Sequence, residues 1–298
     1  MTSVSNVLIL LLHRHGMRHP FVHFEGIGEP VTPELLGTLT DRGRLQMAAL
    51  GRHLAFEHGP DGMAALEPVI PEAIASSVPR CVESSKILFK SFLHEEVNVA
   101  VLKTNFADLY HDMIARNIDA MMAHEFRSDQ GDRVSDYVNF LNEQANSTKE
   151  TPWQKYQIVE SLLLAKETGH ALPPYADEKT LEKCLNIMNR QLIRGFEEIL
   201  FAEIVHDIAA RLRDLPNVRT NFVEYSLSDI NIVPVLERLG LGIDYWPGYG
   251  SGFEIRISAD GAVVLDELRN SADAEISERL AIRKTRLQKL RRKIADGS

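Results

Sequence analysis

The residues best suited to chemistry follow the first apolar stretch of the chain. Arg14 and Arg18 flank His15 within five residues, and Gly16 and Pro20 provide a sharp turn and a rigid exit. A guanidinium group is a planar fork that matches phosphate oxygens and stays charged at any working pH. An imidazole between two such groups can attack phosphorus, because histidine forms covalent intermediates and the cations stabilise the transferred charge. The cluster therefore predicts a phosphate site with a histidine nucleophile.

Two other roles for this histidine follow from the residues alone. A lone histidine after a strand is usually a hydrogen-bonded structural residue, although two flanking arginines argue against that role here. A metal site is the second alternative, because His13, His15, His19 and His23 are clustered. Two adjacent arginines would repel a divalent cation, so we expect neither a metal nor another cofactor.

The elements that must position this cluster are short and alternate in type. Residues 7–12 are continuously apolar, which is typical of a strand covered on both faces. The pattern then predicts helices over 40–57 and 80–93 and strands over 69–76 and 97–102. This alternation predicts an α/β, doubly wound, mostly parallel sheet flanked by helices. His15 would then lie beyond the carboxyl end of a strand, where ligands bind in such sheets.

The middle of the chain differs from both ends. Between 105 and 214 helical patterns dominate, including 153–167 and 177–212. Strand and helix patterns return afterwards, over 221–225, 229–239, 252–257 and 262–268, the last two as a hairpin. We therefore expect an α/β core of residues 1–104 and 215–274, a helical insertion of residues 105–214, and a basic C-terminal helix or tail of residues 275–298.

Charge is unevenly distributed over the 298 residues. The chain has a net charge of −9, which argues against nucleic-acid binding, yet residues 275–298 alone have a net charge of +5. An apolar stripe predicts that this tail is a helix, packed on its own domain or on a second subunit. Contact with an anionic surface is the alternative. Since the tail follows the last strand predicted for the core, we expect it to be dispensable for chemistry.

Cysteine usage and apolar runs indicate the compartment. Cys81 and Cys184 are far apart and form no C-x-x-C motif, which suits a reducing environment. No apolar run is long enough for a transmembrane segment, and the first run lacks the flanks of a signal peptide. The expectation is a cytoplasmic protein of globular composition, with 44% apolar and 25% charged residues.

Segment 14–20, RHGMRHP, resembles the R-H-G-x-R-x-P motif of the histidine acid phosphatases. This family is the branch of the phosphoglycerate-mutase-like superfamily that includes phytases. Segments 39–46, 75–84 and 247–251 are similar to further segments of that family, and the likeness spans about 7–270. The resemblance implies that His15 is a nucleophile that becomes phosphohistidine. It also implies that Arg14, Arg18 and Arg80 hold the phosphoryl oxygens, and that a helical cap is inserted into the α/β domain.

The sequence departs from this family at one position. The family has a His-Asp pair after a late strand, in which the aspartate protonates the leaving alkoxide and the histidine contacts the phosphate. Here Asp229 is retained, but Ser228 stands in place of the histidine. A hydroxyl is a weaker donor than a histidinium, and losing that donor would cost ~2–4 kcal/mol in the transition state. A His206-Asp207 pair also occurs, but it lies within a predicted helix and no strand delivers it to the site.

These features predict a phosphomonoesterase that acts on a small phosphorylated substrate through a phosphohistidine intermediate, slowed by Ser228. The first alternative is a catalytically impaired relative that binds phosphorylated ligands or partners. The second is a phosphotransferase or mutase, which Arg18 and Pro20 disfavour. The substrate is not predicted, because the insertion that would select it contains no recognisable motif. A dimer or an anionic-surface contact through the basic tail is the only macromolecular association suggested.

Overall fold

The chain divides into two units in a computed structural model that describes residues 6–59, 69–215, 220–243, 245–258, 262–270 and 276–286. One unit comprises Met1–Met17, Leu39–Phe106 and Glu197–Ser298, and we call it the sheet unit. The other comprises Arg18–Thr38 and Ala107–Phe196, and we call it the helical unit. Each unit is therefore assembled from separate stretches of sequence.

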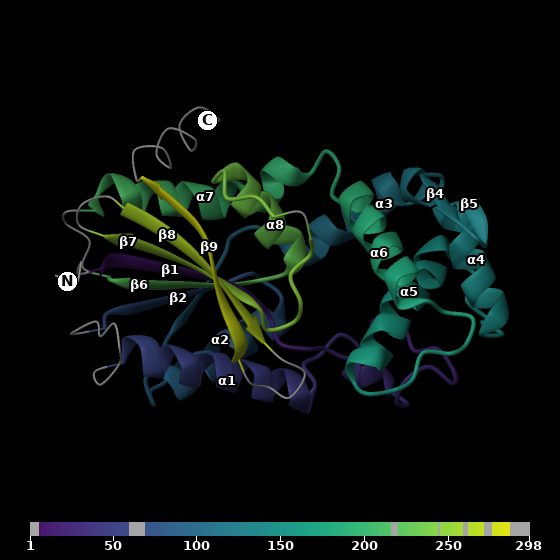
Figure 1. The fold of residues 1–298 in the computed structure, drawn as a ribbon, viewed down its shortest axis with the longest axis horizontal. Coiled ribbons are helices and arrows are strands. Elements are labelled where there is room, and N and C mark those ends of the chain that lie inside the picture. The colour runs from purple at the N-terminus through teal and green to yellow at the C-terminus, as the bar shows by residue number, and fades with distance from the viewer. Residues whose placement is uncertain are drawn as a thin grey trace. The chain divides into compact units, whose positions relative to one another are not determined.

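The sheet unit is built on a seven-stranded mixed sheet with the strand order β3-β2-β6-β1-β7-β8-β9 (Figure 1). The strands are β1 (Asn6–Arg14), β2 (Pro71–Ala75), β3 (Val99–Val101), β6 (Phe222–Leu227), β7 (Gly252–Ser258), β8 (Ala262–Asn270) and β9 (Ile276–Arg286). Strands β3, β2, β6 and β1 are parallel, and β7 is antiparallel to β1. Because Arg14 pairs with Leu227, β1 and β6 end at the same edge of the sheet.

Helices cover both faces of this sheet, which confirms the doubly wound α/β fold. Figure 1 shows α1 (Asp41–His58) and α2 (Pro79–Phe92) on one face and α7 (Glu197–Arg213) and α8 (Asp229–Arg238) on the other. Alternate residues of β1 point to opposite faces, so Ile9 and Leu11 join the core beneath α1 and α2, while Leu10 is buried on the other side. Double coverage explains why residues 7–12 of this strand are all apolar.

Large side chains fill the core between α2 and β6. Phe89 of α2 meets Phe222 of β6 edge to face, with ring centroids 6.2 Å apart. Leu88 and Met47 pack in the same cluster and are fully buried. Burial of each such side chain contributes about 1.5–3 kcal/mol, so this core holds α1 and α2 firmly against the strands that lead to the predicted site.

The helical unit contains most of the segment for which the sequence predicts a helical insertion. It contains α3 (Phe106–Met122), a hairpin of β4 (Glu125–Ser128) and β5 (Gly131–Arg133), and α4 (Val134–Gln144), α5 (Pro152–Glu167) and α6 (Glu178–Leu192), preceded by a short 3₁₀ helix, η1 (Pro33–Leu35). The side chains of Thr151 and Asp177 accept hydrogen bonds from backbone N–H groups in the first turns of α5 and α6, as N-caps do.

The boundaries of the units differ from the predicted domains. The helical pattern over 177–212 is interrupted after α6, which ends at Leu192 and is followed by a turn in which Gly195 has a positive φ of 78°. The second helix, α7, belongs to the sheet unit, and residues 18–38 belong to the helical unit. Helical periodicity cannot show these assignments, because it does not reveal which element a helix packs against.

The predicted C-terminal helix is wrong over Ile276–Arg286. This segment is β9, which pairs antiparallel with β8 at the edge of the sheet. The apolar stripe that suggested a helix is interrupted at Arg283 and Lys284, and the open edge of β8 offers hydrogen bonds along the whole strand. Residues 287–298 of the predicted tail lie outside the described residues. Among the helices of the described part of the chain, none is both long enough and apolar enough to cross a membrane.

Candidate active site

Strand β1 delivers Arg14 and His15 to the edge of the sheet where β6 also ends. The His15 N–H donates to the Leu227 carbonyl at 2.9 Å, and the His15 carbonyl accepts from the Gly250 N–H at 3.1 Å. The next amide, of Gly16, donates to Ser84 Oγ of α2 at 3.2 Å. Backbone bonds to three separate segments therefore hold the predicted nucleophile.

Two glycines allow α1 to begin directly against this turn. A Cβ on Gly16 would lie 2.3 Å from the Gly43 carbonyl oxygen, and one on Gly43 would lie 2.0 Å from the Met17 carbonyl oxygen. Thr40 caps α1 by accepting from the Gly43 N–H at 2.9 Å, and its own N–H donates to Met17. Thr40 and Gly43, which lie in the family-like segment 39–46, thus support the turn that carries His15.

The His15 ring is held in one tautomer. Its Nδ1 lies 2.8 Å from the Gly16 carbonyl oxygen, which can only accept, so Nδ1 carries the hydrogen. Its Nε2 lies 2.9 Å from Arg80 Nε, which can only donate, so Nε2 presents its lone pair. The ring is 1% exposed. Nε2 is therefore the nitrogen that can attack an electrophile.

Arg80 places a positive charge against this nitrogen, and Arg14 is held at Tyr249, whose ring centroid lies 5.7 Å from that of His15. Arg80 lies in the first turn of α2, where Pro79 starts the helix. The Arg14 guanidinium donates to the Pro247 carbonyl at 2.8 Å and lies 3.7 Å from the ring centroid of Tyr249. The sequence flagged the segment of Pro247 and Tyr249 by resemblance only, and the structure shows that it supports Arg14.

Asp229 lies next to Arg14 at the start of α8. Its Oδ2 is 3.2 Å from Arg14 Nη2, and its Oδ1 accepts the Ile230 N–H at 3.1 Å. Since β6 and β1 are neighbours in parallel, the residue after β6 reaches the same edge as His15. A carboxyl group is therefore placed beside the guanidinium of the residue that precedes the candidate nucleophile.

Ser228 is buried between β6 and α8. It is 7% exposed. Burial raises the pKa of the nearby Cys81 thiol, and the Arg80 charge offsets only part of that effect. Position 228 thus supplies a neutral, buried hydroxyl where the resemblance would place a histidine.

His206 and Asp207 lie within α7, as the helical pattern indicates. Asp207 Oδ2 accepts from the Tyr225 hydroxyl at 2.5 Å and from Arg211 Nε at 2.8 Å. Arg211 also donates to both carboxylate oxygens of Glu72, each at 2.8 Å. This network ties α7 to β6 and β2, which makes Asp207 a structural residue of the helix–sheet contact.

Arg18 belongs to the helical unit, whereas Arg14, His15 and Arg80 belong to the sheet unit. Its Nη2 donates to Glu160 Oε1 at 2.5 Å, and its guanidinium lies 3.6 Å from the ring centroid of Phe21. The phosphate contact expected of Arg18 stays a prediction.

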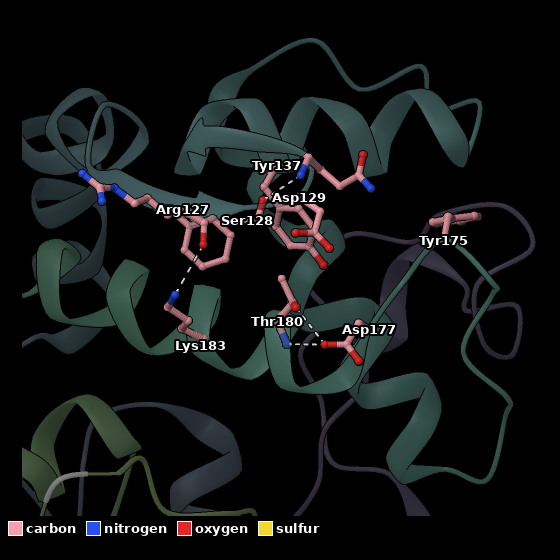
Figure 2. A pocket seen from close by; sticks show the side chains of 10 residues that line it. Arg127, Ser128, Asp129, Tyr137, Tyr175, Asp177, Thr180 and Lys183 are labelled. Carbon is pink, nitrogen blue, oxygen red and sulfur yellow. Dashed lines mark hydrogen bonds between the residues drawn. The ribbon is translucent and has the colours of Figure 1, made fainter.

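The helical unit also contains a hollow of about 270 Å³ between its hairpin and α6 (Figure 2). Two cations, Arg127 and Lys183, and two anions, Asp129 and Asp177, line it. Asp177 already accepts two hydrogen bonds from Thr180, and Lys183 Nζ lies 3.5 Å from the Arg127 carbonyl (Figure 2). Balanced charge and internal pairing give this hollow no preference for phosphate.

The clustered histidines do not converge on one point. His13 is bonded to Glu224 and His15 to Arg80. Within the described ranges, no group of three or more His, Cys, Asp and Glu side chains could hold a metal ion.

Comparisons with known proteins identify the fold. No family model and no curated protein matches the sequence. Among solved structures, a phytase from Citrobacter braakii has a TM-score of 0.64 at 13% identity over 98% of both chains. The Hafnia alvei phytase in complex with myo-inositol hexakis sulphate has a TM-score of 0.65 at 12% identity, covering 99% of this chain and 98% of that one. The Bifidobacterium longum multiple inositol polyphosphate phosphatase, in complex with inositol hexasulfate, has a TM-score of 0.57 at 11% identity over 91% and 87%. The chain therefore has the fold of these phytases, as the resemblance to the histidine acid phosphatases predicted.

Proposed function

We propose that the protein is a phosphomonoesterase that forms a phosphohistidine at His15. The observation that carries this proposal is the state of the His15 ring, whose Nδ1–H is bonded to Gly16 and whose Nε2 lone pair faces Arg80 at 2.9 Å. A bound phosphate would take over the Arg80 donor, which frees the lone pair for attack on phosphorus. The shared fold with phytases supports the same reaction class.

In the first step, Nε2 of His15 forms a bond to phosphorus while the bond from phosphorus to the ester oxygen breaks. Asp229, in its protonated form, gives its proton to the departing alkoxide. Arg14 and Arg80 stabilise the charge spread over the transferring oxygens. The products of this step are an alcohol and a phosphorylated His15.

In the second step, water attacks the same phosphorus. The Asp229 carboxylate accepts a proton from that water, the P–N bond breaks, and its electron pair returns to Nε2 of His15. Inorganic phosphate leaves and Asp229 is protonated again, so the cycle is balanced in atoms and protons. Roles for one carboxyl as acid and then as base follow from microscopic reversibility.

Ser228 favours a second candidate function, a protein that binds phosphorylated ligands with little or no turnover. The Ser228 hydroxyl is neutral and buried, so it adds no charge to the anion pocket. Arg14 and Arg80 alone would still attract a phosphate group.

Trapping the intermediate separates the two candidates. The protein is mixed with p-nitrophenyl phosphate, quenched at alkaline pH, and digested for mass spectrometry, with His15→Ala and the exposed His206→Ala as variants. We expect turnover and a phosphorylated His15 peptide in the parent and in His206→Ala, and neither in His15→Ala. Phosphate binding without turnover or phosphopeptide would favour the binding protein, and normal turnover by His15→Ala would refute the covalent mechanism.

A further inference from the structure

A buried polar chain lies directly behind the catalytic histidine. His13 Nε2 is 2.5 Å from Glu224 Oε1, and the Ser85 hydroxyl donates to Glu224 Oε2 at 2.8 Å. All three residues are 0% exposed. Charged groups are almost never buried to this degree unless they are paired, so the arrangement calls for a physical explanation.

Donor and acceptor rules determine how many protons this chain holds. His13 Nδ1 lies 3.1 Å from the Arg14 carbonyl oxygen, which only accepts, so Nδ1 carries a hydrogen. If Nε2 were bare, its lone pair would face a lone pair of Glu224 at 2.5 Å. One further proton therefore lies between Nε2 and Oε1. The pair is neutral overall whichever atom holds that proton, which makes full burial tolerable.

The bond from His13 fixes one particular peptide group, the one that joins Arg14 to His15. Its carbonyl oxygen accepts from His13 Nδ1, and its N–H donates to the Leu227 carbonyl at 2.9 Å. Rotation of this peptide would move the Arg14 guanidinium and the His15 ring together. The N–H of this peptide is held by the backbone of β6, and its carbonyl oxygen is held by the buried His13 side chain.

The chain also joins the three elements that carry the proposed reaction. His13 lies on β1, two residues before His15; Glu224 lies on β6, five residues before Asp229; and Ser85 lies on α2, five residues after Arg80. Its bonded pairs lie 139 and 211 residues apart in sequence, so only the folded sheet unit brings them together.

We propose that His13 and Glu224 are positioning residues, which act on catalysis by holding the Arg14–His15 peptide through the His13 Nδ1–H bond. This inference rests on the proposed function. A displacement of about 1 Å at a reacting group can cost ~100-fold in rate. Loss of the hydrogen bonds through His13 and Glu224 therefore lowers kcat by about 10- to 100-fold. KM changes by less than about threefold, because Arg80 is untouched.

The test replaces both members of the pair with apolar residues of similar volume. In His13→Leu/Glu224→Leu no buried charge is left alone, and such exchanges are often neutral or stabilising. Glu224→Gln is the conservative variant, since its amide N–H can donate to Nε2 and its amide oxygen can accept from Ser85. We expect the double variant to fold and to lose kcat, with a lower melting temperature because the buried Ser85 hydroxyl loses its acceptor. We expect Glu224→Gln to keep kcat within about threefold of the parent. If the double variant does not fold, His13→Leu/Glu224→Met takes its place.

A matched control lies in the same sheet unit. His58 Nε2 and Glu254 Oε2 form a second fully buried pair, 2.8 Å apart, on α1 and β7. Neither residue is bonded to the Arg14–His15 peptide. His58→Leu/Glu254→Leu removes a buried His–Glu pair together with the 3.3 Å ion pair between Glu254 and Arg256, which keeps its contact with Asp266. We expect its kcat to stay within about twofold of the parent.

A second measurement does not require turnover. The ¹⁵N shifts of the His15 ring report whether Nδ1 carries the hydrogen, and we expect mixed tautomers in His13→Leu/Glu224→Leu but not in the control pair. A parent without phosphatase activity would refute the proposed function and leave the tautomer shift as the test of positioning. A folded double variant with parental kcat and tautomer, or a control pair that loses as much kcat, would overturn the positioning role.

Discussion

Replacing Asp229 with asparagine tests the chemistry most directly. The amide is nearly isosteric, and its one oxygen can accept from the Ile230 N–H or from Arg14, but not from both. It also cannot give a proton to a departing alkoxide, so the assay must separate lost proton donation from a weakened Arg14 contact. The expected loss in kcat for an alkyl phosphate is about 100- to 10,000-fold, the range for general acid catalysis. That loss corresponds to ~2.7–5.5 kcal/mol in the activation barrier.

The leaving group separates proton donation from other effects. A nitrophenolate can depart without receiving a proton, whereas a glycerol alkoxide needs one. We therefore expect Asp229→Asn to lose far more activity on glycerol phosphate than on p-nitrophenyl phosphate, with both substrates assayed over the same pH range. Equal losses on the two substrates would refute proton donation by Asp229 and would point to a role in holding Arg14.

Asp207→Asn is the comparison that the structure makes informative. Asp207 accepts hydrogen bonds from Tyr225 and Arg211, so its loss should destabilise the protein by about 1–3 kcal/mol. That loss corresponds to a melting temperature lower by about 2–4 °C for each kcal/mol. Activity per folded molecule should stay near that of the parent. An Asp207→Asn protein that melts at the parental temperature but does not hydrolyse the substrate would show that the proton donor is misassigned.

Three further outcomes follow from the structure. Arg80→Ala should weaken inorganic phosphate binding by about 10- to 150-fold, the value of a charged hydrogen bond of ~1.5–3 kcal/mol, as measured by calorimetry; unchanged binding would exclude this arginine from the anion pocket. Burial raises the pKa of Cys81, and that of Cys184 to about 12, so both stay protonated at pH 8 and should react with a thiol reagent only after unfolding; fast labelling of the native protein would contradict this. Deletion of residues 276–298 removes β9 from the sheet and should lower the melting temperature, whereas a truncated protein as stable as the parent would show that the β8 edge needs no partner.

Local patterns predicted much of the fold. The apolar run at residues 7–12, the helix that follows Thr40 and the hairpin over 252–268 all appear close to their expected bounds as β1, α1 and β7–β8. Each depends on spacing within a few residues and on a cap or turn nearby, which the sequence displays directly. The segment 276–286 was mispredicted because its state depends on the open edge of β8 rather than on its own periodicity.

The sequence by itself determined which chemistry is available. The order of Arg14, His15 and Gly16 at the end of an apolar strand, with Asp229 after a later strand, is a local feature that needs no coordinates. Only the tertiary structure decided which partners these residues meet. Arg80 contacts His15 across 65 positions and Glu224 contacts His13 across 211, because parallel strands and the helices on them bring distant segments to one edge of the sheet. Periodicity indicates which face of an element is buried, but not which element covers it, and for that reason the buried pair behind His15 could be found only in the fold.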